Sequence, residues 1–175
     1  MPVRVYLETG AKRTFACALD WPGWCRSGKD EGVALAALET YAARYRPVAE
    51  AAGFPLPADV AFDVVERLTG NATTDFGAPA IVAGQDSAPL DAAAQERLSK
   101  LLDAARATFE RVASSAPAEL RKGPRGGGRD TEAIRRHVSE ADAAYVRKLS
   151  WPPAYAARRR AWHLLDHAWE IEDKS

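Results

Sequence analysis

The first third of the chain alternates between apolar and polar positions, which is the pattern of half-buried β-strands. Val3, Val5 and Leu7 alternate with polar neighbours, and a second strand is predicted over residues 13–19. The loop that follows leads into a short third strand that ends at Gly28. The alternation returns further along, which predicts a fourth strand with these apolar positions: Val60, Phe62 and Val64.

A helix is predicted between the third and fourth strands. Asp30 can cap its first turn, and Pro47 interrupts it. Four residues at helical spacing share its apolar face: Ala34, Leu38, Tyr41 and Tyr45. The order strand, strand, strand, helix, strand predicts that residues 1–68 form a small antiparallel sheet with one helix.

Residues 69–90 show no periodicity and are punctuated by glycine and proline, so an irregular connecting loop is expected. Loops longer than about 12–15 residues are uncommon unless they are functional or disordered. The segment is therefore either a plain linker or a loop that reaches over a site. We expect it to lie across the junction of one joined body, because the short helical part that follows needs apolar cover from elsewhere.

Three amphipathic helices are predicted in residues 91–175. The first is expected over 91–115, the second after a cap at Asp130, and the third over about 155–172. The sequence Trp151-Pro152-Pro153 separates the last two. Helices with such short connections are expected to form an antiparallel bundle. The fold class is therefore α+β, with a small N-terminal antiparallel sheet followed by a helical bundle.

The composition limits the class of protein. The 24 Lys and Arg residues balance 24 Asp and Glu residues, which argues against a general nucleic-acid or membrane binder. No apolar run approaches the roughly 20 residues that span a bilayer, and the first residues do not resemble a signal peptide, so a cytoplasmic location is expected. Cys17 and Cys25 do not make a disulfide scaffold. Cys25 is either a reactive thiol beside Arg26 or a half-buried structural cysteine.

All three histidines lie in the C-terminal quarter of the chain. His163 and His167 are four residues apart, so a helix places both imidazoles on one face. His137 lies on the apolar stripe of the preceding helix, where a histidine is either a core residue or a ligand. A reversal at residues 151–153 brings His137 nearly level with His163, so the three can meet. Three imidazoles suit a divalent ion such as Zn²⁺ or Ni²⁺ and leave positions open for water or substrate.

The C-terminal part, from about Asp91, resembles the DinB/YfiT-like superfamily of bacterial metalloenzymes. The matching pieces are the long first helix and the segments 119–130, 134–142 and His163-Leu164-Leu165-Asp166-His167. The resemblance implies that His137, His163 and His167 bind a divalent metal. Characterised members include thiol transferases that use bacillithiol, mycothiol or glutathione, so it also implies a small-molecule substrate and a low-molecular-weight thiol. Family members usually carry a further helix between the two histidine-bearing segments, and this chain lacks it.

The N-terminal part, residues 1–68, looks like a HicB-like module. The features that carry this resemblance are Pro22-Gly23, Gly28 and an Ala- and Leu-rich helix over residues 33–38. No DNA-binding element follows them, so an antitoxin role is not implied.

Two functions of different class are consistent with these patterns. The first is a metal-dependent enzyme, possessing a three-histidine site flanked by Asp166 and Glu170 as candidate catalytic acids or as acceptors for an imidazole N–H. The second is a non-catalytic binding or structural protein that keeps a relict or structural metal site. A homodimer is expected in either case, because three helices leave apolar surface on the Trp-rich last helix uncovered.

Overall fold

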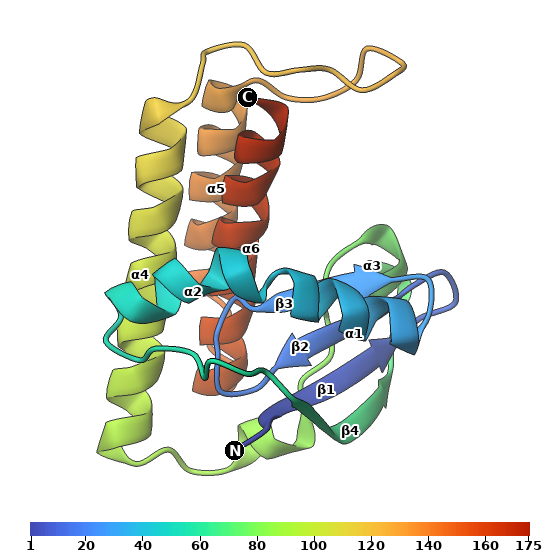
Figure 1. Cartoon of the computed structure of the whole chain (residues 1–175), viewed down its shortest axis with the longest axis vertical. Helices are drawn as coiled ribbons and strands as arrows, with labels where there is room; N and C mark the ends of the chain where they lie inside the picture. The colour runs from blue at the N-terminus through green and yellow to red at the C-terminus, as the bar shows by residue number, and fades with distance from the viewer.

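One four-stranded sheet forms the N-terminal part of the protein, whose computed structural model describes residues 1–175 (Figure 1). Its strands are β1 (Val3–Thr9), β2 (Thr14–Ala18), β3 (Cys25–Gly28) and β4 (Phe62–Thr69). They lie in the order β3-β2-β1-β4, and β2 is antiparallel to both of its neighbours. β4 pairs with β1 in parallel, so the expected antiparallel sheet is wrong at this edge. The sheet is mixed because the chain crosses over through helices before it enters β4.

Two helices, α1 (Glu31–Thr40) and α2 (Ala42–Ala51), make this crossover where the sequence predicts one. Asp30 caps α1 as expected, because its carboxylate accepts a hydrogen bond of 2.9 Å from the backbone in the first turn. The break falls at Tyr41, whereas Pro47 lies inside α2. Tertiary contacts stabilise α2 despite the proline: Tyr45 is fully buried, and its hydroxyl donates a hydrogen bond of 2.8 Å to the Pro22 carbonyl.

A disulfide joins the two strands β2 and β3. Cys17 and Cys25 lie directly opposite each other in the ladder and are bonded, and both are buried. Cys25 is therefore not a free reactive thiol, and the structural alternative describes it. Sequence patterns alone do not predict this disulfide, because it depends on the register between the two strands.

Two short helices interrupt the segment between β4 and the bundle, where only irregular structure is expected. These are α3 (Ala72–Phe76) and the 3₁₀ turn η1 (Gly84–Ser87). Asn71 caps α3 by accepting hydrogen bonds from the amides of Thr73 and Thr74. A single turn of this kind is stabilised by its cap, so no hydrophobic periodicity marks it in the sequence.

The same segment lies across the junction between the sheet and the bundle, as expected. Glu8 of β1 is fully buried, and its carboxylate accepts hydrogen bonds from the amides of Ala80 and Ile81. Further along, Asp86 forms a buried ion pair with Arg158 of the last helix. One end of the segment is therefore attached to the sheet and the other to the bundle.

Three long helices form the C-terminal bundle: α4 (Ala92–Ser115), α5 (Thr131–Val146) and α6 (Pro153–Lys174). Asp91 caps α4 through the Ala94 amide, at 2.7 Å. Asp130 precedes α5 but does not cap it, because its carboxylate accepts from the Leu120 amide and pairs with Lys122. The mixed sheet and the bundle confirm the α+β class. None of the helices is both long enough and apolar enough to cross a membrane.

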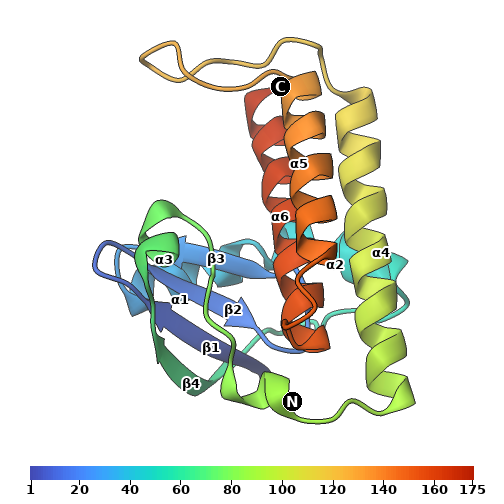
Figure 2. The same cartoon turned by 180° about the vertical axis from the view of Figure 1, so that it is seen from behind.

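The N-terminal module covers the last helix. Seen from behind, the sheet lies beside α6 while α5 faces the viewer (Figure 2). Trp162 packs edge-on against Phe15 of β2, and Trp169 packs against Tyr41, so both indoles are buried within the chain. The apolar surface on which the homodimer expectation rests is thus already covered. Trp151 is half-buried beside Tyr145 rather than in the bundle core.

Candidate metal centre

The three histidines of the chain converge between α5 and α6. His163 Nε2 lies 3.2 Å from His137 Nε2, and one nitrogen from each of the three rings lies within 4.8 Å of the others. The ring centroid of His167 is 5.0 Å from that of His137 and 4.6 Å from that of His163. The structure therefore brings together the three residues that the sequence singled out as candidate ligands.

Helical geometry explains this convergence. His163 and His167 lie one turn apart on α6 and share a face. The chain reverses between α5 and α6. Ile134 and Val138 are buried, so the side of α5 that carries His137 faces the interior. His163 is 7% exposed, whereas His137 and His167 are partly exposed. The cluster is thus closed on one side and open to solvent on the other.

The environment keeps the central imidazole neutral. Burial lowers the pKa of His163 to about 3, and the neighbouring His167 and His137 act in the same direction. Burial also lowers the pKa of His137, with a further contribution from the positive charge of Arg129. A neutral imidazole has a free nitrogen lone pair, which is the form that binds a metal.

Glu170 orients the third imidazole. Its Oε2 accepts a hydrogen bond of 2.7 Å from His167 Nδ1, and its Oε1 accepts one of 2.6 Å from Lys174. The hydrogen bond from His167 is the main cause that lowers the pKa of Glu170 to about 2, and the hydrogen bond from Lys174 acts in the same direction. Because Nδ1 of His167 carries the shared proton, its Nε2 is left as the metal-binding atom.

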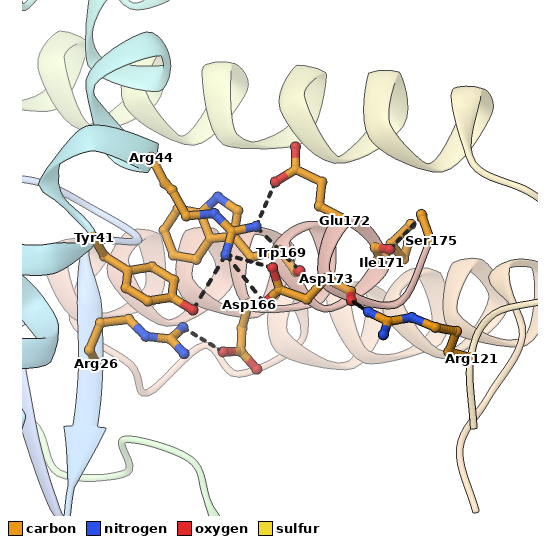
Figure 3. Close-up of polar contacts among 10 residues, drawn as sticks. All are labelled: Arg26, Tyr41, Arg44, Arg121, Asp166, Trp169, Ile171, Glu172, Asp173 and Ser175. Carbon is orange, nitrogen blue, oxygen red and sulfur yellow. Dashed lines mark hydrogen bonds and ion pairs between the residues drawn. The ribbon is translucent and has the colours of Figure 1, made fainter. Parts of the chain in front are cut away.

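Asp166 is bound by a residue of the sheet. Arg26 of β3 donates a hydrogen bond of 2.9 Å from Nη1 to Asp166 Oδ1, and its guanidinium lies 4.0 Å from the centre of the Tyr41 ring (Figure 3). Asp166 therefore contacts the N-terminal module and not an imidazole. Arg26 and Tyr41 also line a cleft of about 430 Å³ with Trp169 and Glu170, which places this cleft beside the histidine cluster.

A second arginine completes the contact between α6 and the N-terminal module. Arg44 of α2 pairs with Glu172 at 2.7 Å and with Asp173 at 3.0 Å, and it donates to the Trp169 carbonyl (Figure 3). The end of α6 that follows the histidine pair is thus attached to α2, so α6 contacts both modules.

Arg159, which lies one turn before His163, was not predicted as a site residue from the sequence. Its guanidinium is 5.0 Å from the centre of the Tyr145 ring and 4.7 Å from that of Trp162. The signal that identifies it is its spacing of four residues from His163, which places both on one face of α6. That spacing is common on surface helices, and only the burial of Arg159 gives it meaning.

Because comparisons with known proteins found no match, the function is inferred from the geometry of the three histidines. No family model, no curated protein and no solved structure matches the chain.

Proposed function

We propose that the protein is a divalent-metal-dependent enzyme whose metal is held by His137, His163 and His167. The observation that carries this proposal is the spacing of the ring nitrogens. Two bonds of about 2.0–2.1 Å that meet at a tetrahedral angle separate the ligating nitrogens by about 3.3 Å. The His137 and His163 Nε2 atoms are 3.2 Å apart, so these two rings already have the separation that a shared ion requires.

The partial exposure of the cluster favours a catalytic site over a structural one. Structural zinc sites are closed by four protein ligands, whereas catalytic sites use three and leave a position for water or substrate. The chain supplies three imidazoles and no fourth ligand, since Glu170 is bound to His167 Nδ1 and Asp166 to Arg26. None of the three histidines lines the cleft of about 430 Å³, but Glu170, which is bound to His167, does.

We further propose a group transfer in which a low-molecular-weight thiol attacks an electrophilic small molecule, as the DinB/YfiT-like resemblance implies. When bound, Zn²⁺ or Ni²⁺ supplies the chemistry of lowering the pKa of a thiol or water. The residues of the chain hold the metal and orient its ligands. His163 stays neutral because it is buried, and Glu170 fixes the tautomer of His167. Asp166 helps to position α6 through Arg26 and is not needed as a base.

The test is the metal content of protein purified without a histidine tag, measured by mass spectrometry of the elements. We expect about one equivalent of Zn²⁺ or Ni²⁺, lost in His163→Ala and retained in the exposed control Ser139→Ala. Metal-free protein that is equally stable with and without a chelator supports the non-catalytic alternative instead.

Thiol transfer is tested separately with the metal-loaded protein. Glutathione and 1-chloro-2,4-dinitrobenzene serve as the probes, because the thiolate displaces chloride and the thioether product is followed by its absorption in the near ultraviolet. We expect conjugation above the background rate, lost in His163→Ala. A rate equal to the background with glutathione, and with other low-molecular-weight thiols, excludes this reaction while leaving the metal site to the first test.

A further inference from the structure

Arg159 is a buried cation that forms no ion pair with a carboxylate. Arg159 is only 9% exposed, and its Nη1 nitrogen is buried with no hydrogen-bond acceptor. Its neighbour Arg158 is also buried but pairs with Asp86 at the junction. A buried charge is strongly destabilising unless an opposite charge or hydrogen bonds offset it. Each of the two arginines has one buried nitrogen without an acceptor, but only Arg159 also lacks a carboxylate to balance its charge.

The location of Arg159 connects it to the histidine cluster. The Tyr145 ring centre lies 5.0 Å from its guanidinium and 5.6 Å from the ring centre of His163. The Trp162 ring centre likewise lies 4.7 Å from the guanidinium and 6.1 Å from the ring centre of His163. Two aromatic rings thus contact both the cation and the central imidazole.

The balance of charge around this place is positive. Three neutral imidazoles leave both positive charges of a divalent ion uncompensated, and Arg159 adds a third. Two of the nearby carboxylates are already engaged, since Glu170 is bound to His167 and Lys174, and Asp142 pairs with Arg160 and Arg106. A third, Glu140 of α5, is exposed to solvent, which screens its charge. An anionic ligand is what such an arrangement attracts.

We infer that Arg159, with Tyr145 and Trp162, forms a carboxylate-binding subsite for the substrate of the metal centre. The inference rests on the proposed metal site and specifies its substrate class. That class is a small anionic molecule with a metal-coordinating group at one end and a carboxylate about one helical turn away, roughly 6 Å. Arginine suits this role because its planar guanidinium binds a carboxylate through two parallel hydrogen bonds.

Two hydroxamic acids that differ only in their tail test this inference. Both coordinate metal through the hydroxamate; succinic acid monohydroxamate ends in a carboxylate, and butyrohydroxamic acid ends in a methyl group. The full-length protein is loaded with Co²⁺, and the change in its visible absorption reports each dissociation constant. We expect the carboxylate ligand to bind roughly tenfold to a hundredfold more tightly, the range of a hydrogen bond to a charged group.

Substitution of Arg159 then identifies the source of this preference. In Arg159→Gln we expect the two hydroxamates to bind equally, with the affinity for butyrohydroxamic acid unchanged. Arg159→Lys keeps the charge without the planar geometry and is expected to retain part of the preference. Arg136→Gln removes the same charge from an exposed position beside His137 and is expected to retain all of it.

The outcomes separate this inference from the function on which it rests. Protein that takes up no Co²⁺ refutes the metal site itself. Co²⁺-loaded protein that binds both hydroxamates equally refutes only the subsite, and this comparison needs no variant to fold. If Arg136→Gln and Arg159→Gln lose the preference for the carboxylate ligand equally, the subsite is also refuted, because the preference then depends only on the overall positive charge.

Discussion

Arg26 Nη1 of strand β3 lies 2.9 Å from Asp166 Oδ1 of helix α6, although the two residues are 140 positions apart in the chain. The side chain of Arg26 is 22% exposed and that of Asp166 is 35% exposed, so water screens the pair only in part. The guanidinium also lies over the Tyr41 ring. This contact links the sheet to the helix that carries two of the three histidines.

The coupling between Arg26 and Asp166 is measurable by a double-mutant cycle. We expect Arg26→Gln and Asp166→Asn to be non-additive in the free energy of unfolding by about 0.5–1 kcal/mol, because the pair is partly shielded from water. Urea denaturation of the four proteins gives this value. The Arg67–Glu31 pair is a matched control that is more exposed, with side chains 62% and 43% exposed, and should couple less. Fully additive effects at Arg26 and Asp166 contradict the prediction.

The hydrogen bond from His167 to Glu170 predicts an effect on metal affinity. In Glu170→Gln the acceptor loses its charge, the orientation of the imidazole is less well fixed, and we expect metal binding to weaken by about 10–100-fold. Competition with a chromophoric chelator measures the change. Glu172→Gln on the same helix, which removes only the contact with Arg44, should bind metal like the unaltered protein. Equal affinities in the two variants count against the role of Glu170.

The low pKa of His163 predicts a pH dependence for the stability of the metal-free protein. The folded chain keeps this imidazole neutral down to about pH 3, whereas an unfolded histidine titrates near 6.5. Between these values the unfolded state binds more protons, so the contribution is complete above pH 6.5 and is lost as the pH falls. From pH 6.5 to 5 we expect a loss of about 2 kcal/mol. Urea unfolding across this range should show a much smaller slope in His163→Leu; an unchanged slope rejects the assignment.

The disulfide between β2 and β3 predicts a loss of stability on reduction. It closes a loop with a sequence separation of 8, for which the chain-entropy estimate is about 2–3 kcal/mol. Urea unfolding with and without dithiothreitol measures the difference. The double variant Cys17→Ala/Cys25→Ala is expected to be insensitive to reductant. Reduced protein, verified by thiol titration, that is as stable as the oxidised form would contradict this estimate.

Much of the fold follows from local periodicity. The alternation in residues 3–7 and the stripes in residues 91–115 depend only on which residues are apolar, so the sequence predicts those elements well. The convergence of the histidines follows in the same way, because the four-residue spacing of His163 and His167 and the reversal at residues 151–153 set their heights along the bundle.

The features that the sequence did not predict depend on partners outside the helix concerned. Pro47 does not end its helix because Tyr45 is buried against Trp24 and Pro22, which precede β3. Asp130 does not cap α5 because Lys122 and the Leu120 amide take its carboxylate. The significance of Arg159 appears only when the rings of two different helices enclose it. In each case the deciding contact cannot be read from the residue's own neighbours in the chain.

The joining of α6 to both modules has a consequence for the order in which the protein is made. A ribosome adds about 5–20 residues per second, so roughly 6–30 seconds separate the emergence of β3 from that of α6. During this interval the last strand of the sheet and His137 are synthesised before the helix that carries His163 and His167. The histidine cluster is thus among the last features to assemble, and a metal bound there reports that synthesis has passed through α6.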